Sequence, residues 1–132
     1  MRAERQRARG WFRHEKLDVW HKAMGSTREV YKASAGFPAE ERFGLTAQLR
    51  RAAVSVPSNV AEGAGRSTHA ETVRFLEIAY GSLMEAVCQL RLASDLGWLP
   101  PDDHESLRQD AEEVARMLSG LRATRQQESA NR

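Results

Sequence analysis

The segment AEERFGLTAQLRRAAVSVPSNVAEGAGR, residues 39–66, carries the clearest helical pattern in this chain of 132 residues. Its apolar residues recur at spacings of three and four, which places them on one face of a helix. They are Leu45, Leu49, Ala52, Val56 and Val60. The pattern predicts an amphipathic helix from Ala39 to Gly63, which the following glycines bring to an end.

Pro57 lies inside this predicted helix. Proline has no backbone N–H, so the carbonyl of Ala53 would lose its usual hydrogen-bond partner. We therefore expect either a kink at Pro57 or two helices that meet between Ser55 and Pro57.

The residues before this segment predict a helix from Leu17 to Ala35. Apolar and small residues again repeat at helical spacing, and Gly36, Phe37 and Pro38 then stop the helix. The expected core stripe consists of Leu17, Trp20, Met24, Thr27 and Tyr31.

Two more helices follow residue 66. Thr68 and Glu71 have the spacing of a capping box, which predicts a helix that ends near Leu96, with Gly97 as its cap. Its expected stripe consists of Val73, Leu76, Tyr80, Leu83, Val87 and Leu90. The last helix begins at Pro100-Pro101-Asp102 and ends near Thr124. Its stripe consists of Leu107, Ala111, Val114, Leu118 and Leu121.

Short connections between these helices favour an all-α fold, an antiparallel up-and-down four-helix bundle about 30 Å long. Residues 15–124 form the expected bundle domain. Residues 1–14 form a basic N-terminal arm that we expect to be flexible, and residues 125–132 form an expected loose C-terminal tail.

Composition points to a cytoplasmic protein without a membrane role. Apolar residues make up 41% and charged residues 29% of the chain. No apolar run approaches the roughly 20 residues that span a bilayer, and the first residues lack the apolar stretch of a secretory signal. The lone cysteine, Cys88, forms no internal disulfide and is expected to be an inert packing residue, as are the tryptophans Trp11, Trp20 and Trp98.

The net charge is only +2, but residues 1–16 carry six basic residues and two acidic ones, a local charge of +4. The six are Arg2, Arg5, Arg7, Arg9, Arg13 and Lys16. Such an arm either contacts phosphates or is a solvated terminus that aids solubility.

Three of the helices carry more apolar residues than one bundle interior requires. The surplus residues are Val19, Ala23, Val30, Phe43, Val54, Pro57, Phe75, Ile78, Ala79, Ala86 and Ala93. This surplus predicts that copies of the chain self-associate. The alternative is that these side chains wrap around one broad core.

Polar residues form a strip along one side of the helix that contains Pro57. They are Gln48, Arg51, Ser55, Ser58, Asn59 and Glu62, and Arg66 joins them if helical geometry continues. Arginine beside small hydroxyls suits phosphate recognition. The alternative is an internal network in which Glu62 pairs with Arg66 or Arg51, since an unpaired carboxylate would repel a phosphate.

Four motifs resemble the bacterial 23S rRNA-intervening sequence proteins, first noticed as reading frames within large-subunit ribosomal RNA genes. These motifs are LDVWHKA (17–23), FPAEERFGLTAQLRRAAVSVPSNVAEGAGR (37–66), FLEIAYGSLMEA (75–86) and DLGWL (95–99). The resemblance implies a four-helix bundle that assembles as a homopentamer and a proposed role in binding ribosomal RNA or other nucleic acid. The residues it carries over are Arg50, Arg51, Asn59, Glu62 and Arg66.

The sequence predicts no enzyme, cofactor or metal site. The histidines, His14, His21, His69 and His104, are dispersed, and none lies in a metal-binding spacing. Two functions remain. One is RNA binding through Arg13, Lys16, Arg50, Arg51 and Arg66, with Gln48, Ser55, Ser58, Asn59 and Glu62 as a structural polar network. The other is an oligomeric scaffold that docks another protein.

Overall fold

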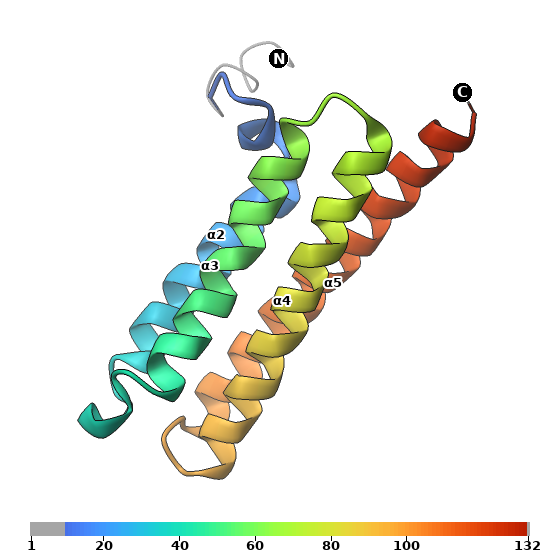
Figure 1. The fold of residues 1–132 in the computed structure, drawn as a ribbon. Coiled ribbons are helices and arrows are strands. Elements are labelled where there is room, and N and C mark those ends of the chain that lie inside the picture. The colour runs from blue at the N-terminus through green and yellow to red at the C-terminus, as the bar shows by residue number, and fades with distance from the viewer. Residues whose placement is uncertain (1–9, 132) are drawn as a thin grey trace.

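The computed structural model describes residues 10–131, which form four long helices and two 3-10 turns (Figure 1). The elements in chain order are η1 (Arg13–Lys16), α2 (Asp18–Ser34), η2 (Ala39–Glu41), α3 (Leu45–Ala64), α4 (His69–Asp95) and α5 (Pro101–Ala130). No strand occurs in this part of the chain. The predicted all-α four-helix bundle is confirmed. Within residues 10–131, no helix is both long and apolar enough to cross a membrane.

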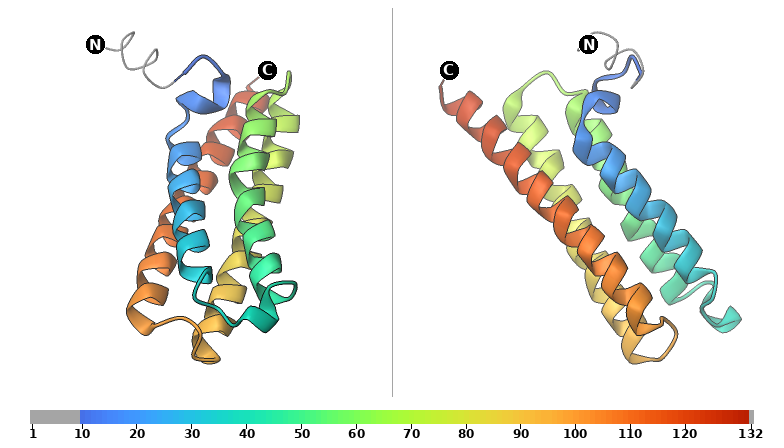
Figure 2. Two further views of the ribbon diagram at one scale, coloured as in Figure 1. Left: turned by 90° about the vertical axis from the view of Figure 1, so that its left-hand side faces the viewer. Right: turned by 180° about the vertical axis from the view of Figure 1, so that it is seen from behind.

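The connections divide between the two ends of the bundle (Figures 1 and 2). The connections from α2 to α3 and from α4 to α5 lie at one end. The η1 turn, the α3–α4 connection and the last turns of α5 gather at the other. Segments that are far apart in the sequence therefore meet at this second end.

Two predicted helix boundaries are wrong. The helix expected from Ala39 is broken, because the chain turns at Gly44 and α3 begins at Leu45, whose N–H donates to Glu41 Oε1 at 3.2 Å. The last helix does not end near Thr124 but runs to Ala130. The expected loose tail is therefore helical up to that residue. Arginine, glutamine and glutamate there propagate a helix well even without an apolar stripe.

The buried stripes of α3 and α5 largely match the prediction, whereas those of α2 and α4 are rotated toward smaller residues. All five predicted α3 residues are buried, as are four of the five on α5, with Leu121 partly exposed. On α2, Val19, Ala23 and Val30 are buried, while Tyr31 is exposed. On α4 the buried face includes Ala79, Ala86 and Ala93, while Val73, Tyr80 and Val87 are only partly buried.

Small residues face the neighbouring helices because they permit close approach. The clearest case is Gly63, expected to break the chain but placed inside α3 and buried. A Cβ on Gly63 would lie 2.9 Å from the Cβ of Phe75 and 3.3 Å from the carbonyl oxygen of Thr72. The glycine therefore serves the packing of α3 on α4 rather than the end of the helix.

Much of the predicted apolar surplus fits inside one bundle. Val19, Ala23, Val30, Pro57, Ala79, Ala86 and Ala93 are buried. Phe43, Val54 and Ile78 remain exposed at 84%, 40% and 41%, and Met84, Leu92 and Leu96 join them. The argument for self-association therefore rests on a smaller set of residues than the sequence indicated.

An ion-pair group joins the first and last helices. Lys22 Nζ on α2 lies 3.1 Å from Asp110 Oδ1 and 3.2 Å from Glu113 Oε2 on α5. The hydrogen bonds to Asp110 and then to Glu113 raise the pKa of Lys22 above its usual 10.5. The pair ties together two helices that are not joined directly by a loop.

Pro57 lies within one continuous helix, so the alternative of two helices meeting there is wrong. The kink stays a prediction. The carbonyl of Ala53 accepts a hydrogen bond from Thr27 Oγ1 on α2 at 3.1 Å. The same hydroxyl donates to the carbonyl of Ala23 at 2.8 Å, so its single proton is shared between the two carbonyls. The hydroxyl on α2 thus supplies the donor that Pro57 removes from α3.

Replacing Thr27 with valine keeps the side-chain shape and leaves the buried carbonyl of Ala53 unpaired. We expect T27V to lower the free energy of unfolding by about 1–2 kcal/mol, measured by urea denaturation. Thr124→Val is the control, because the Thr124 hydroxyl bonds only the carbonyl of Gly120 on an exposed helix face. That control should change stability by less than about 0.5 kcal/mol.

The same substitution in a Pro57→Ala background separates this hydrogen bond from general packing. An alanine in place of Pro57 has an N–H for the Ala53 carbonyl, so T27V should be less destabilising there than in the native chain. An equal loss of stability in both backgrounds would contradict the assignment.

Candidate RNA-binding end of the bundle

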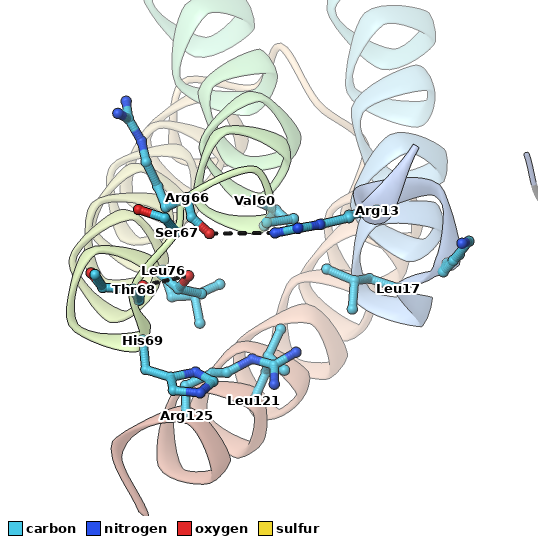
Figure 3. A pocket seen from close by; sticks show the side chains of 13 residues that line it. Arg13, Leu17, Val60, Arg66, Ser67, Thr68, His69, Leu76, Leu121 and Arg125 are labelled. Carbon is cyan, nitrogen blue, oxygen red and sulfur yellow. Dashed lines mark hydrogen bonds between the residues drawn. The ribbon is translucent and has the colours of Figure 1, made fainter. Parts of the chain in front are cut away.

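A cavity of about 370 Å³ lies at the end of the bundle where η1, the α3–α4 connection and α5 meet (Figure 3). Its lining residues are Arg13, Lys16, Leu17, Val60, Ala64, Arg66, Ser67, Thr68, His69, Thr72, Leu76, Leu121 and Arg125. Three arginines, one lysine and one histidine are thus present. None of the described residues that line the cavity is acidic.

The apolar part of the cavity comes from α3, α4, α5 and the residue just before α2. Val60 on α3 and Leu76 on α4 are almost completely buried, at 0% and 2% exposure. Leu17, before α2, and Leu121, on α5, are partly exposed beside them. The accessible aliphatic surface beneath the basic rim therefore comes from Leu17 and Leu121, with Val60 and Leu76 buried behind them.

Arg13 spans the cavity from η1. Its Nη1 donates to the carbonyl oxygen of Arg66 at 3.5 Å, and Figure 3 shows the guanidinium reaching toward the α3–α4 connection. The Arg13 side chain is exposed and has no ion-pair partner among the described residues. Its remaining N–H groups can therefore bind a ligand.

The side chain of Arg66 points away from the cavity, although the sequence placed it among the phosphate contacts (Figure 3). Its Nη2 donates to Glu62 Oε1 at 2.7 Å, and its guanidinium lies 4.6 Å from the ring centroid of Phe75. Arg66 thus contributes its backbone carbonyl to the cavity. Its positive charge is paired on the outer surface of α3 and α4.

On the opposite side, Glu128 holds two basic groups together. Glu128 Oε2 accepts a hydrogen bond from Arg125 Nη1 at 2.9 Å and lies 3.3 Å from His69 Nδ1. This arrangement orients both side chains beside Leu121 in Figure 3. Arginine has five N–H donors, so this bond leaves others for a ligand.

Thr68 shapes the adjacent wall as the N-cap of α4. Its Oγ1 accepts a hydrogen bond from Glu71 N–H at 3.2 Å, which confirms the threonine half of the predicted capping box. The hydroxyl of Thr72 donates to the carbonyl of Gly63 at 2.8 Å. These bonds fix the α3–α4 connection and direct the positive end of α4 toward the same region.

The predicted polar strip lies along the α3–α4 seam, where several of its members bond to one another. Ser55 and Ser82 share a hydrogen bond of 2.8 Å, and Asn59 Nδ2 donates to the Ser55 carbonyl at 2.8 Å and hydroxyl at 2.9 Å. Glu62 pairs with Arg66. Gln48 and Ser58 are exposed. The interpretation as an internal network accounts for these bonds.

Arg50 and Arg51 differ sharply despite being adjacent. Arg50 turns toward α2, where its Nε donates to Ser34 Oγ at 2.8 Å and its Nη2 to the Tyr31 carbonyl at 3.1 Å. Its guanidinium also lies 4.5 Å from the centroid of the Tyr31 ring. Arg51 is exposed beside a hollow of about 160 Å³ at the α3–α4 seam.

The structure therefore brings together only part of the predicted RNA-binding set. Arg13, Lys16 and the backbone of Arg66 line the cavity, whereas Arg50 and Arg51 do not. Arg2, Arg5, Arg7 and Arg9 lie outside the described residues. Sequence reasoning missed His69 and Arg125. The only signal for Arg125 was its basic side chain, in a segment assigned to a tail.

Two other expectations are corrected. Cys88 is exposed rather than packed. Trp11 is 83% exposed, so it does not anchor the fold, whereas Trp20 and Trp98 are partly buried. Among residues 10–131, no group of three histidine, cysteine, aspartate or glutamate side chains could hold a metal ion.

Comparisons with known proteins bear on the family and the fold. A family model described as "23S rRNA-intervening sequence protein" matches residues 15–120. A solved structure of a protein with unknown function from the S23 ribosomal protein family of Bacteroides thetaiotaomicron is similar, with a TM-score of 0.74 and 20% sequence identity. That similarity covers 80% of this chain and 95% of the other, and it shows the shared fold. No curated protein matches this chain.

The different surroundings of Arg50 and Arg51 predict opposite effects of substitution. Arg50→Ala should lower the free energy of unfolding by about 1–2 kcal/mol, because it removes two hydrogen bonds from a charged donor. Arg51→Ala, with the same change in charge, should alter it by less than about 0.5 kcal/mol. Urea denaturation measures both. Equal stability of the two variants would show that the Arg50 contacts to α2 contribute nothing.

Proposed function

Because the chain belongs to the 23S rRNA-intervening sequence protein family, we propose that it is a non-enzymatic, oligomeric four-helix bundle that binds structured RNA. The proposed RNA contact is the end of the bundle that holds the basic cavity. Arg13, Lys16 and Arg125 supply phosphate contacts there. We propose that the protein acts in the cytoplasm, because a chain with a single, exposed cysteine suits a reducing compartment.

The observation that supports this proposal most is the gathering of basic side chains from separate segments. Arg13 and Lys16 come from η1 and Arg125 from the far end of α5, yet all line one cavity. None of its described lining residues is acidic, and the carboxylate beside it, Glu128, pairs with Arg125 and His69. In the sequence, residues 1–9, which lie outside the described residues, carry Arg2, Arg5, Arg7 and Arg9 against Glu4. Positive charge concentrated in this way attracts a polyanion.

Oligomerisation would multiply this weak contact. Ile78 and Leu92 on α4 and Leu96, its C-cap residue, are exposed and fall within about 40° of one another on a helical projection, with Glu85 between Ile78 and Leu92 on the same face. These three residues form an interrupted apolar stripe, and exposed apolar side chains on one face suit contact with a second copy. In the homopentamer that the family resemblance implies, five basic ends would act on one RNA, and avidity would exceed the affinity of each end.

A second candidate function is an oligomeric scaffold that docks another protein without touching RNA. The side chain of Phe43, 84% exposed, favours it, since the α2–α3 connection that carries this residue lies at the other end of the bundle from the α3–α4 connection (Figure 1). A pull-down with and without nuclease separates the two functions. Partners that survive nuclease treatment support the scaffold, and partners that are released by it support RNA binding.

The RNA-binding proposal predicts a steep dependence on salt. A transcript of a ribosomal RNA stem-loop should bind at low salt, and the R13Q/K16Q double variant should bind more weakly. The slope of log K against log salt should become shallower by roughly one for each phosphate that the variant no longer binds. The charge-matched control is R28Q/R116Q, which removes two exposed arginines outside the cavity. Equal binding by both double variants would contradict the proposed site.

The proposed self-contact predicts that charge on the α4 stripe disrupts assembly. I78E/L92E should shift the molar mass measured by light scattering toward that of one chain, because two glutamates would be buried unpaired in the interface. Q109E/S119E, on α5, is the control and should leave the mass unchanged. A wild-type protein that is monomeric at micromolar concentration would refute the oligomer directly.

A further inference from the structure

The basic cavity has an aliphatic floor that phosphate contacts alone do not use. We propose that it accommodates a single unpaired nucleotide of an RNA strand, with the base on the floor and the phosphate at the rim between Arg13 and Arg125. This inference rests on the proposed RNA-binding function and assigns that function a ligand class and a specific site.

The size of the cavity suits one nucleotide and excludes a duplex. Its volume of about 370 Å³ lies at the lower end of the range for small-molecule sites, roughly 300–1,000 Å³. A base paired within an A-form helix cannot enter a hollow of this size, whereas an unstacked base can turn out of its strand. The partly exposed side chains of Leu17 and Leu121, backed by the buried Val60 and Leu76, replace the neighbouring bases with apolar contacts.

The rim carries the polar groups that such a ligand needs. Arg13 reaches in from η1, and His69 and Arg125 lie on the α4 and α5 side (Figure 3). The arginines offer unused N–H donors to a phosphate. Ser67 and Thr68 line the same wall and add polar residues to the rim.

Two exposed aromatic residues immediately precede Arg13 and supply a stacking surface for the adjoining base. Trp11 is 83% and Phe12 58% exposed, and their rings lie edge to face with centroids 5.4 Å apart. Neither ring contributes much to the core. Exposed aromatic rings next to basic residues are typical of surfaces that bind single-stranded nucleic acid, because every base has a face that can stack.

The test uses a 3′-fluorescein-labelled single-stranded RNA of ten nucleotides, without self-complementarity, and its fully paired duplex. L121W fills the cavity without a change in charge, and S67W blocks its mouth from the exposed α3–α4 connection. The control M84W introduces the same large ring at an exposed residue of α4, outside both the cavity and the apolar stripe. Fluorescence anisotropy measures binding, and thermal melting verifies that each variant is folded.

We expect L121W and S67W to weaken single-strand binding about tenfold or more, the range for removal of one stacked base. Duplex binding should change less than about twofold in both, and M84W should resemble the native protein. W11A should likewise weaken single-strand binding more than F43A, which removes an exposed ring elsewhere.

Native-like single-strand binding by folded L121W and S67W would overturn the proposed cavity site. If R13Q/K16Q still weakened binding in that case, the proposed RNA-binding function would stand without it. Competition with adenosine monophosphate tests whether the cavity binds a nucleotide within an RNA strand or a free nucleotide. Competition only at concentrations far above the Kd of the strand supports the strand, whereas competition near that Kd overturns it in favour of the free nucleotide.

Discussion

The close packing of α3 on α4 at Gly63 is the contact on which the candidate site depends. A side chain at Gly63 would collide with Phe75, and the Gly63 carbonyl accepts the hydroxyl of Thr72. These two contacts hold the end of α3 against the start of α4. Thr68 then caps α4 directly beyond the connection. The position of His69 and of the Arg66 carbonyl beside the cavity follows from this packing.

The rest of the molecule brings the remaining parts of the site to the same end. The two hydrophobic clusters of the core follow one another along the bundle, and the second contains Val60, Leu76 and Leu118. Because this cluster extends to the last turns of α3 and the first of α4, its outermost residues become the floor of the cavity. The ion pairs of Lys22 with Asp110 and Glu113 join α2 to α5. The cavity lies between η1, which precedes α2, and the last turns of α5.

The arginines illustrate how one residue type takes different tasks in different surroundings. Arg50 satisfies carbonyl and hydroxyl groups of α2, and Arg66 neutralises Glu62 over an aromatic ring. Arg13 has no ion-pair partner among the described residues, and Arg125 pairs with Glu128 through one N–H, which leaves its other donors unused. An arginine whose donors are already used within the fold is a poor ligand contact, since binding must first break those bonds. The number of free donors, rather than the number of arginines, therefore defines the basic end.

The sequence by itself determined the four helices, most of their ends and the buried stripes of α3 and α5, because these depend on local spacing and on capping residues such as Thr68. The rotated stripes of α2 and α4 could not be predicted, because the choice of Ala23 over Tyr31 or of Ala79 over Tyr80 depends on how closely neighbouring helices approach. Only the tertiary structure placed Arg125 on the same cavity as Arg13 and turned the side chains of Arg50 and Arg66 toward other partners. Residues so far apart in the chain meet through packing of whole helices, and spacing along one helix contains no information about that meeting.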